Sequence, residues 1–196
     1  MAKPRILLFA GSSRKDSFAR RTANAAAPIL AAAGAEVTHV ELADYPMPVY
    51  NGDDEAANGL PETVKQLRKL IAEHDAILVA SPEYNGSMTP LLVNTIDWCS
   101  RQDPRSGDKT PGTAIYADKP AAMISSSLGP LGGMRALFHL RDLLGYLGMI
   151  VIPQQVAVGS AMEAFTPEGG FARPKDQAMV EGVTKALVAA TSKLRG

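Results

Sequence analysis

The chain has 196 residues, 46% hydrophobic and 20% charged, with 20 Lys and Arg against 20 Asp and Glu, so we expect one globular domain over residues 1–196. The charge balance excludes an extended nucleic-acid surface, and no run of about 20 apolar residues or signal-peptide pattern indicates a membrane-bound or secreted protein. The single cysteine, Cys99, excludes an internal disulfide framework and favours a reducing, cytoplasmic setting.

Strands and helices are predicted in strict alternation. In chain order the first half predicts a buried strand at 5–10, an Ala-rich helix at 17–33, a half-exposed strand at 36–42, a helix at 61–75 and a buried strand at 76–81. The second half predicts a helix at 90–100, a buried strand at 120–127, a helix at 134–148, a strand at 150–158 and a closing helix at 174–194. This α/β alternation predicts a parallel sheet with helices on both faces. Ligands bind such sheets at the carboxyl ends of the strands, which directs attention to three loops.

The first of these loops is GSSRKDS, residues 11–17. Small and hydroxyl residues before a helix make an anion site, because backbone amides and the helix dipole both favour negative charge there. Arg14 adds a planar charged donor suited to phosphate. Arg20 and Arg21 stand in the first helical turn, where the dipole disfavours cations unless an anion is bound; both also fit plain solvated positions. The alternative for the whole loop is an ordinary Ser-capped helix.

The class of phosphate ligand follows from the motifs that are absent. The loop matches neither the G-x-x-x-x-G-K-[ST] pattern of triphosphate sites nor the G-x-G-x-x-G pattern of dinucleotide sites. Glu41, after the second strand, is only a weak candidate for binding a ribose. A mononucleotide is the class that remains.

The second and third loops carry residues suited to a flat ring. In SPEYNGS, residues 81–87, Tyr84 offers an aromatic platform, and Asn85 and Gly86 offer backbone amides. In SSSLGPLGG, residues 125–133, the serines and glycines allow close approach of the backbone to a ligand. The alternatives are a plain turn for the second loop and a flexible linker for the third. Together the three loops predict a site for a nucleotide with a flat heterocycle.

These stretches, together with SPEYNGSMTPLLVNTIDW and SSLGPLGGMRALFHLR, resemble the NADPH-dependent FMN reductase family of flavodoxin-like proteins over about residues 5–190. The resemblance implies a doubly wound five-stranded parallel sheet in the order 2-1-3-4-5 and bound FMN. It also implies a set of cofactor-binding residues around the phosphate, the ring and the far side: Ser12, Arg14, Ser17, Phe18, Pro82, Glu83, Tyr84, Asn85, Gly86, Ser127 and Gly129. The chain departs from the family at two positions: Ala19 replaces an Asn, for which Arg20 is a candidate substitute, and Val93 replaces a Lys.

The function implied by the resemblance is a ping-pong oxidoreductase. Hydride would pass from NADPH or NADH to FMN, and electrons would then pass to a flavin, quinone, azo or metal-oxyanion acceptor. No catalytic side chain and no metal site is expected, because His39, His74 and His139 have no metal-ligand spacing and the cofactor carries the chemistry. The alternatives are a non-enzymatic flavodoxin-type electron carrier, which is usually acidic, and a non-redox scaffold protein.

Two long segments, 45–59 and 101–119, predict assembly, since a compact domain seldom carries such loops without a use for them. The first would expose an apolar patch formed by Tyr45, Met47, Pro48, Val49 and Tyr50. We therefore expect a homodimer or homotetramer with the flavin near a subunit boundary, the alternative being that both loops fold back over their own sheet. Trp98 and Cys99 are expected to be packed helix residues.

Overall fold

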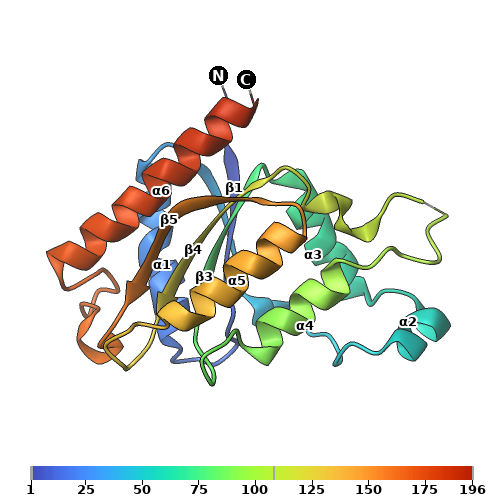
Figure 1. The fold of residues 1–196 in the computed structure, drawn as a ribbon, viewed down its shortest axis with the longest axis horizontal. Helices are drawn as coiled ribbons and strands as arrows, with labels where there is room; N and C mark the ends of the chain where they lie inside the picture. Colours follow the sequence, from blue (N-terminus) through green and yellow to red (C-terminus); the bar gives the residue numbers. More distant parts are fainter. Residues whose placement is uncertain (1, 108, 196) are drawn as a thin grey trace.

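The computed structural model describes residues 2–107 and 109–195, and its centre is a five-stranded sheet in the order β2-β1-β3-β4-β5 (Figure 1). The strands are β1 (Arg5–Ala10), β2 (Glu36–Val40), β3 (Ala76–Ser81), β4 (Pro120–Ser126) and β5 (Ile150–Val158). All four neighbouring pairs are parallel. The predicted class, strand number and strand order are confirmed.

Helices cover both faces of the sheet (Figure 1). One face carries α1 (Phe18–Ala32) and α6 (Pro174–Arg195), and the other carries α3 (Glu62–Glu73), α4 (Pro90–Cys99) and α5 (Met134–Tyr146). Successive strand residues point to opposite faces, so in β1 Ile6 and Leu8 enter the first core and Leu7 enters the second. Within the described segments, no helix has the length and apolar character needed to cross a bilayer.

The segment after β2 is more ordered than its sequence predicts. It contains the 3₁₀ turn η1 (Leu42–Asp44) and the helix α2 (Gly52–Asn58), which Asn51 caps by accepting a hydrogen bond from the amide of Asp53. Trp98, on α4, donates its indole N–H to the carbonyl of Pro48 at 2.8 Å. Tyr50 packs edge-on against the Trp98 ring at 5.1 Å.

The apolar patch expected on segment 45–59 is therefore mostly absent. Tyr45, Met47 and Tyr50 are partly buried and pack against the core, whereas Val49 is 84% exposed. The patch was expected because an apolar run with no helical or strand periodicity gives no sign of what covers it. Tertiary contacts with α4 supply that cover.

The segment 101–119 also folds back on its own sheet face; within it, residue 108 lies outside the described residues. Arg105 donates a hydrogen bond to the carbonyl of Ala57 in α2, and Asp103 pairs with Lys65 of α3 at 3.4 Å. The segment contains the 3₁₀ helix η2 (Gly112–Ile115). The two long segments thus support each other instead of projecting freely.

The exposed edge strand β5 carries a bulge. Its pairing with β4 shifts register between Val151 and Gln155, around Pro153. Arg141 of α5 covers this irregular edge by donating to the Gln155 side chain at 2.8 Å and to the Pro153 carbonyl at 3.4 Å. A proline, a bulge and a covering cation all discourage pairing with another strand. The chain then passes through η3 (Ala161–Glu163) to α6.

Candidate functional site

The loops after β1, β3 and β4 meet in a cleft of about 160 Å³ at the carboxyl ends of these strands. This is where the chain reverses its direction of travel across the sheet, from β2 back over β1 to β3. The residues that line the cleft come from all three loops: Ser12, Arg14, Ser17, Phe18, Ala19, Pro82, Glu83, Tyr84, Ser126, Ser127 and Leu128.

Eight of the eleven predicted site residues lie in this lining. Asn85, Gly86 and Gly129 do not, because the first two form the tip of a turn and the third packs against neighbouring backbone. Three lining residues lie outside the predicted set: Ala19, which the sequence analysis named only as a departure from the family, and Ser126 and Leu128, which it missed. The only signal for the two missed residues was their position at the end of a buried strand, which does not say which of several successive residues turns toward a ligand.

The start of α1 presents several hydrogen-bond donors to the cleft. Ser17 is the residue before the helix and has extended backbone, with φ −71° and ψ 130°, but its side chain caps no helix amide. The first-turn amides of a helix have no intrahelical acceptor. Ser12 and Ser17 are buried, 6% and 3% exposed, and both residues line the cleft. Donors are therefore collected at the positive end of α1.

The three arginines near this end have different surroundings. Arg14 is exposed, and its guanidinium donates only a long, 3.5 Å bond to the carbonyl of Asp16. Arg20 is tied down by an ion pair with Glu41 at 2.7 Å and by donating to the Arg14 carbonyl at 3.4 Å. Arg20 therefore braces the loop, and neither it nor Glu41 is available as the phosphate or ribose contact considered from the sequence.

Arg21 is half-buried, so its expected solvated position is wrong. Its guanidinium carbon lies 4.7 Å from the centre of the Phe165 ring and 5.9 Å from that of Phe18. Phe165 in turn packs on Phe171 at 5.5 Å. A cation over aromatic rings is stabilised without an anion, which explains the second first-turn arginine by packing. The sequence of α1 could not indicate this packing, because Phe165 and Phe171 lie more than 140 positions further along the chain.

The β3–α4 loop contains a tight turn. Tyr84 and Ser87 exchange two backbone hydrogen bonds, of 2.9 and 3.0 Å, around Asn85 and Gly86. Both central residues have positive φ, 53° and 75°, which is the type I′ geometry favoured by Asn-Gly. The turn holds Tyr84 at the cleft with 49% of its surface exposed.

Thr89 ties this loop to the first. As the residue before α4 it accepts from the amide of Leu92 at 3.3 Å, and its hydroxyl donates to the Gly11 carbonyl at 2.6 Å. Sequence reasoning missed this residue, although Thr-Pro directly before a predicted helix is a capping signal. The two walls of the cleft are thus fixed relative to each other.

Glu83 ties the same loop to α5. Its carboxylate accepts from Nε and Nη2 of Arg135, at 3.0 and 2.7 Å, and from the amides of Arg135 and Ala136, at 3.0 and 3.3 Å. Burial alone would raise the pKa of Glu83, but the hydrogen bonds from Arg135 and Ala136 outweigh it and hold the pKa below its usual value. Glu83 lines the cleft with a carboxylate that is already engaged.

The β4–α5 loop is packed and is not a flexible linker. Ser125 donates its hydroxyl to the Gly132 carbonyl at 2.8 Å. A Cβ on Gly132, which has φ 62°, would lie 2.7 Å from the backbone at the end of β5, so the glycine is required by this close approach. Ser126 differs from its neighbours, because its buried hydroxyl has no hydrogen-bond partner among the described residues.

Neither a cysteine nor a histidine is among the residues that line the cleft. Burial raises the pKa of the Cys99 thiol to about 12, despite the opposing charge of Arg68. Both ring nitrogens of His74 are engaged, one with the Leu70 carbonyl and one with the Thr38 hydroxyl, each at 2.6 Å. Over residues 2–107 and 109–195 there is no group of three or more His, Cys, Asp or Glu arranged to hold a metal.

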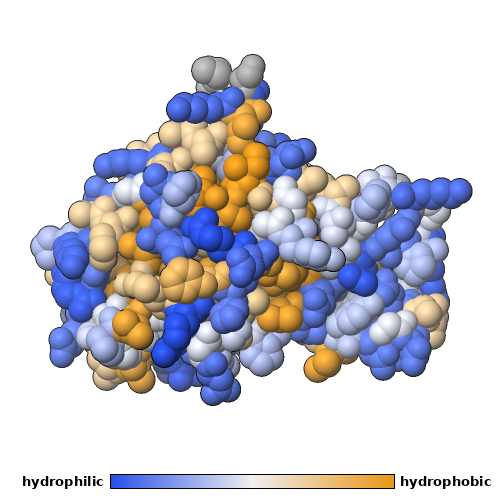
Figure 2. All heavy atoms as spheres, in the orientation of Figure 1, coloured by the Kyte–Doolittle hydropathy of each residue, from blue (hydrophilic) through white to orange (hydrophobic). Residues whose placement is uncertain are grey.

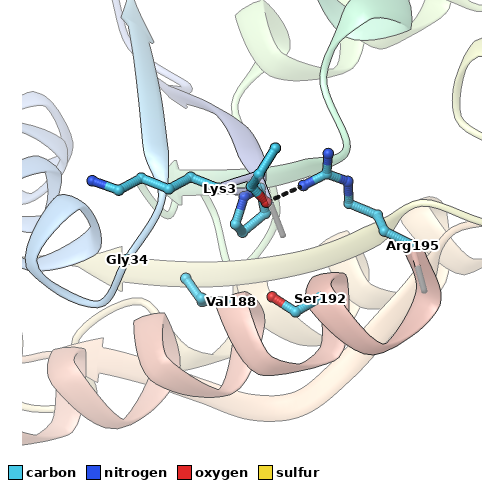
Figure 3. A pocket seen from close by; sticks show the side chains of 7 residues that line it. Lys3, Gly34, Val188, Ser192 and Arg195 are labelled. Carbon is cyan, nitrogen blue, oxygen red and sulfur yellow. Dashed lines mark hydrogen bonds between the residues drawn. The ribbon is translucent and has the colours of Figure 1, made fainter.

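A larger cavity of about 360 Å³ lies at the opposite end of the sheet, between the two ends of the chain (Figure 3). Its lining includes Lys3, Gly34, Ser192 and Arg195 (Figure 3). Arg195 donates to the carbonyl of Ala2 at 3.2 Å and pairs with Asp75. This cavity lies between α6 and the residues just before β1, and no residue of the three loops lines it.

Comparisons with known proteins agree with this geometry. A family model described as NADPH-dependent FMN reductase matches residues 4–163, which include all three loops of the cleft. The chain is 36% identical over 159 residues to an NAD(P)H-dependent FMN reductase of Pseudomonas aeruginosa, covering 80% of each chain. It is 35% identical over 191 residues to an NAD(P)H:quinone oxidoreductase of Solanum tuberosum, covering 95% of this chain and 92% of the relative. The solved structure of FerB from Paracoccus denitrificans, a flavoenzyme NAD(P)H:(acceptor) oxidoreductase, matches with a TM-score of 0.81 and 26% identity over 97% of this chain and 98% of that one.

Proposed function

This chain belongs to the NADPH-dependent FMN reductase family, and from that membership we propose that the three-loop cleft holds the flavin and that a quinone accepts the electrons. The protein is an NAD(P)H-dependent oxidoreductase with FMN as its cofactor. When bound, FMN takes a hydride from the nicotinamide and passes electrons to an acceptor. This membership disfavours the non-enzymatic carrier considered from the sequence.

The β1–α1 wall of the cleft fits the phosphate of FMN. A dianion needs several donors, and the first-turn amides of α1, the buried hydroxyls of Ser12 and Ser17 and the exposed Arg14 supply them in one place. Because Arg20 and Arg21 are engaged elsewhere, Arg14 is the cation that we assign to the phosphate.

The other two walls fit the ring. Ser126, which lines the cleft, has a buried hydroxyl with no hydrogen-bond partner among the described residues, and such groups are rare unless a ligand or water satisfies them. Tyr84 stands on the neighbouring wall with half of its surface exposed. We assign the ring to the space between these two residues, with Pro82 and Ser127 also in contact. Asn85, Gly86 and Gly129 are assigned supporting positions in their turns.

The acceptor is proposed from the chemistry of the cleft mouth. Tyr84 and Leu128 come from different walls, both line the cleft, and they are 49% and 63% exposed. Leu131 and Met134, which follow Leu128 in the chain, are 51% and 43% exposed. A flat apolar acceptor such as a quinone fits this rim better than a metal oxyanion does, because the adjacent guanidinium of Arg135 is bound by Glu83. The relative from Solanum tuberosum is named a quinone oxidoreductase.

The acceptor is tested with the purified yellow protein. Anaerobic NADPH should bleach the flavin rapidly, and slow bleaching would favour a carrier. Rates should then be compared for a benzoquinone, free FMN, an azo dye and chromate at equal concentration. We expect the quinone to give the highest kcat/KM. A higher value for chromate or free FMN would refute the quinone proposal and leave the flavin site untouched.

A second copy of the chain is proposed to complete the site. The cleft volume of about 160 Å³ is below the roughly 300 Å³ at which small-molecule sites begin, so one chain covers only part of a flavin. The apolar rim continues along α5 through Phe138, which is 54% exposed. Figure 2 shows apolar side chains at the surface between α5 and α4 and over β5. We therefore move the expected homodimer contact from the two long segments to α5.

Light scattering tests this contact. Phe138→Glu should reduce the mass at micromolar concentration from two chains to one, because a charge would be buried in the interface. Val49→Glu is the matched control, since Val49 is 84% exposed on segment 45–59. If only the Val49→Glu variant dissociates into single chains, the dimer interface lies on segment 45–59 and not on α5. A tetramer, the other expected assembly, would show as a mass of four chains.

The chain is further proposed to act as one domain in the cytoplasm. The single sheet and its two cores draw residues from both ends of the chain, from Ile6 to Leu187, which supports a single folding unit over residues 1–196. The one cysteine is buried and unpaired, as is usual for proteins of a reducing compartment.

A further inference from the structure

We propose that Glu83 and Arg135 form a charge pair that sets the reduction potential of the flavin, Glu83 lowering it and Arg135 raising it. The inference rests on the proposed location of FMN in the three-loop cleft. It assigns to these two residues an electrostatic role through the flavin and no direct part in hydride transfer.

The pair is unusually well fixed for two residues 52 positions apart. The Glu83 side chain is 9% exposed, whereas that of Arg135 is 62% exposed. Nε and Nη2 of Arg135 both point at Oε1 of Glu83, at 3.0 and 2.7 Å. Oε2 accepts from the backbone amides of Arg135 and Ala136. A carboxylate held by four donors cannot turn away from the cleft that it lines.

The same carboxylate serves the positive end of a helix. The residue before α5 is Gly133, which has a left-handed backbone with φ 86° and no side chain to cap the helix, and α5 has no acidic residue in its first turn. A helix N-terminus carries about half a positive charge. Glu83, supplied by a different loop, therefore balances both this partial charge and the guanidinium of Arg135.

The position of the pair brings its charge beside the proposed ring. Glu83 immediately precedes Tyr84, and both residues line the cleft. A Cβ on Gly86 would lie 4.0 Å from Cδ and Nε of Arg135, so the guanidinium runs alongside the turn that carries Tyr84. Apolar groups such as Leu128 share the cleft, and charges act more strongly where water is partly excluded.

The sign of the effect follows from the charge gained on reduction. A two-electron reduced flavin is stabilised by nearby positive charge and destabilised by nearby negative charge. Loss of the Glu83 charge leaves the α5 N-terminus and Arg135 unbalanced, which favours reduction. Loss of the Arg135 charge leaves the carboxylate opposed by the helix end alone, which disfavours it. A merely structural role would instead make both substitutions act in the same direction.

The test measures the midpoint potential of the FMN-loaded protein anaerobically against a reference dye for Glu83→Gln, Arg135→Gln and the double variant. We expect a rise for Glu83→Gln, a fall for Arg135→Gln and a value near wild type for the double variant. Each single shift should be of the order of tenfold in the reduction equilibrium, which is about 30 mV for two electrons. Glu181→Gln is the matched control, because Glu181 pairs with Lys185 on the exposed side of α6 at 3.3 Å and should shift nothing.

The outcomes separate this inference from the function on which it rests. Shifts of equal sign, or no shift in protein that binds FMN normally, overturn the charge-pair proposal and leave the flavin site standing. If variants in all three loops, including Arg14→Ala, bind FMN with the affinity of the wild type, the assignment of FMN to the cleft is itself overturned. If Glu83→Gln fails to fold, Arg135→Gln decides alone: a fall in potential supports the pair, and an unchanged or raised potential refutes it.

Discussion

Arg14→Ala should weaken FMN binding and leave the fold intact. Arg14 lines the cleft at the start of α1 and makes only a 3.5 Å bond to the Asp16 carbonyl, so its removal breaks nothing on which the fold depends. The gross attraction between a guanidinium and a phosphate about 4 Å apart near a protein surface is about 4 kcal/mol. After desolvation, hydrogen bonds to charged groups contribute about 1.5–3 kcal/mol.

Exposure places Arg14 at the lower end of that range, because solvent screens its charge. A loss of about 1.5 kcal/mol corresponds to a roughly tenfold increase in the Kd for FMN. The assay is a titration of flavin-free protein with FMN, followed by flavin fluorescence, and repeated with riboflavin. Since riboflavin lacks the phosphate, its Kd should be the same for wild type and variant.

Arg21→Ala is the matched control. Its guanidinium stacks on Phe165 at 4.7 Å, and a cation–π contact contributes about 0.5–2 kcal/mol. This variant should therefore lower the thermal midpoint without a selective loss of FMN over riboflavin. Equal FMN affinities for the two variants, or an equal loss of riboflavin binding in Arg14→Ala, would refute the assignment of Arg14 to the phosphate.

Three further predictions concern stability and reactivity. Gly86→Ala should destabilise the protein by about 1–2 kcal/mol, because Gly86 has φ 75°, whereas Gly182→Ala, with open space around it in α6, should stabilise it slightly; urea unfolding compares them. The Cys99 thiol, with its pKa raised to about 12 by burial, should react with a thiol reagent at pH 8 only after unfolding, and rapid native labelling would show that the helix opens. The lowered pKa of Glu83 should add stability at pH 6 that is lost as the pH falls below the unfolded value of about 4.5 toward the folded one. The gap between the thermal midpoints of wild type and Glu83→Gln should therefore narrow as the pH falls below 4.5, and a gap of constant size would contradict the ionised pair.

The strand framework was predictable because its physics is local. A strand buried on both faces has to be apolar throughout, and 5–10 and 76–81 show this directly in their letters. The alternation of strands and helices then predicted a parallel sheet, and in a parallel sheet the loops that follow the strands meet at the carboxyl ends of those strands. Eight of the eleven residues implied by the family resemblance line the cleft that these loops form.

The sequence alone thus determined the α/β class and the three loops, and it predicted a phosphate-binding helix start, since each depends on residues close together in the chain. Only the tertiary structure decided which arginine remains free, because Glu41 and Phe165 reach Arg20 and Arg21 from distant segments. It also decided that segment 45–59 folds back, through hydrogen bonds from α4, and that Glu83 caps a helix 52 residues away. Such contacts depend on how elements pack in space, and no local pattern of residue types records which distant partner a side chain will meet.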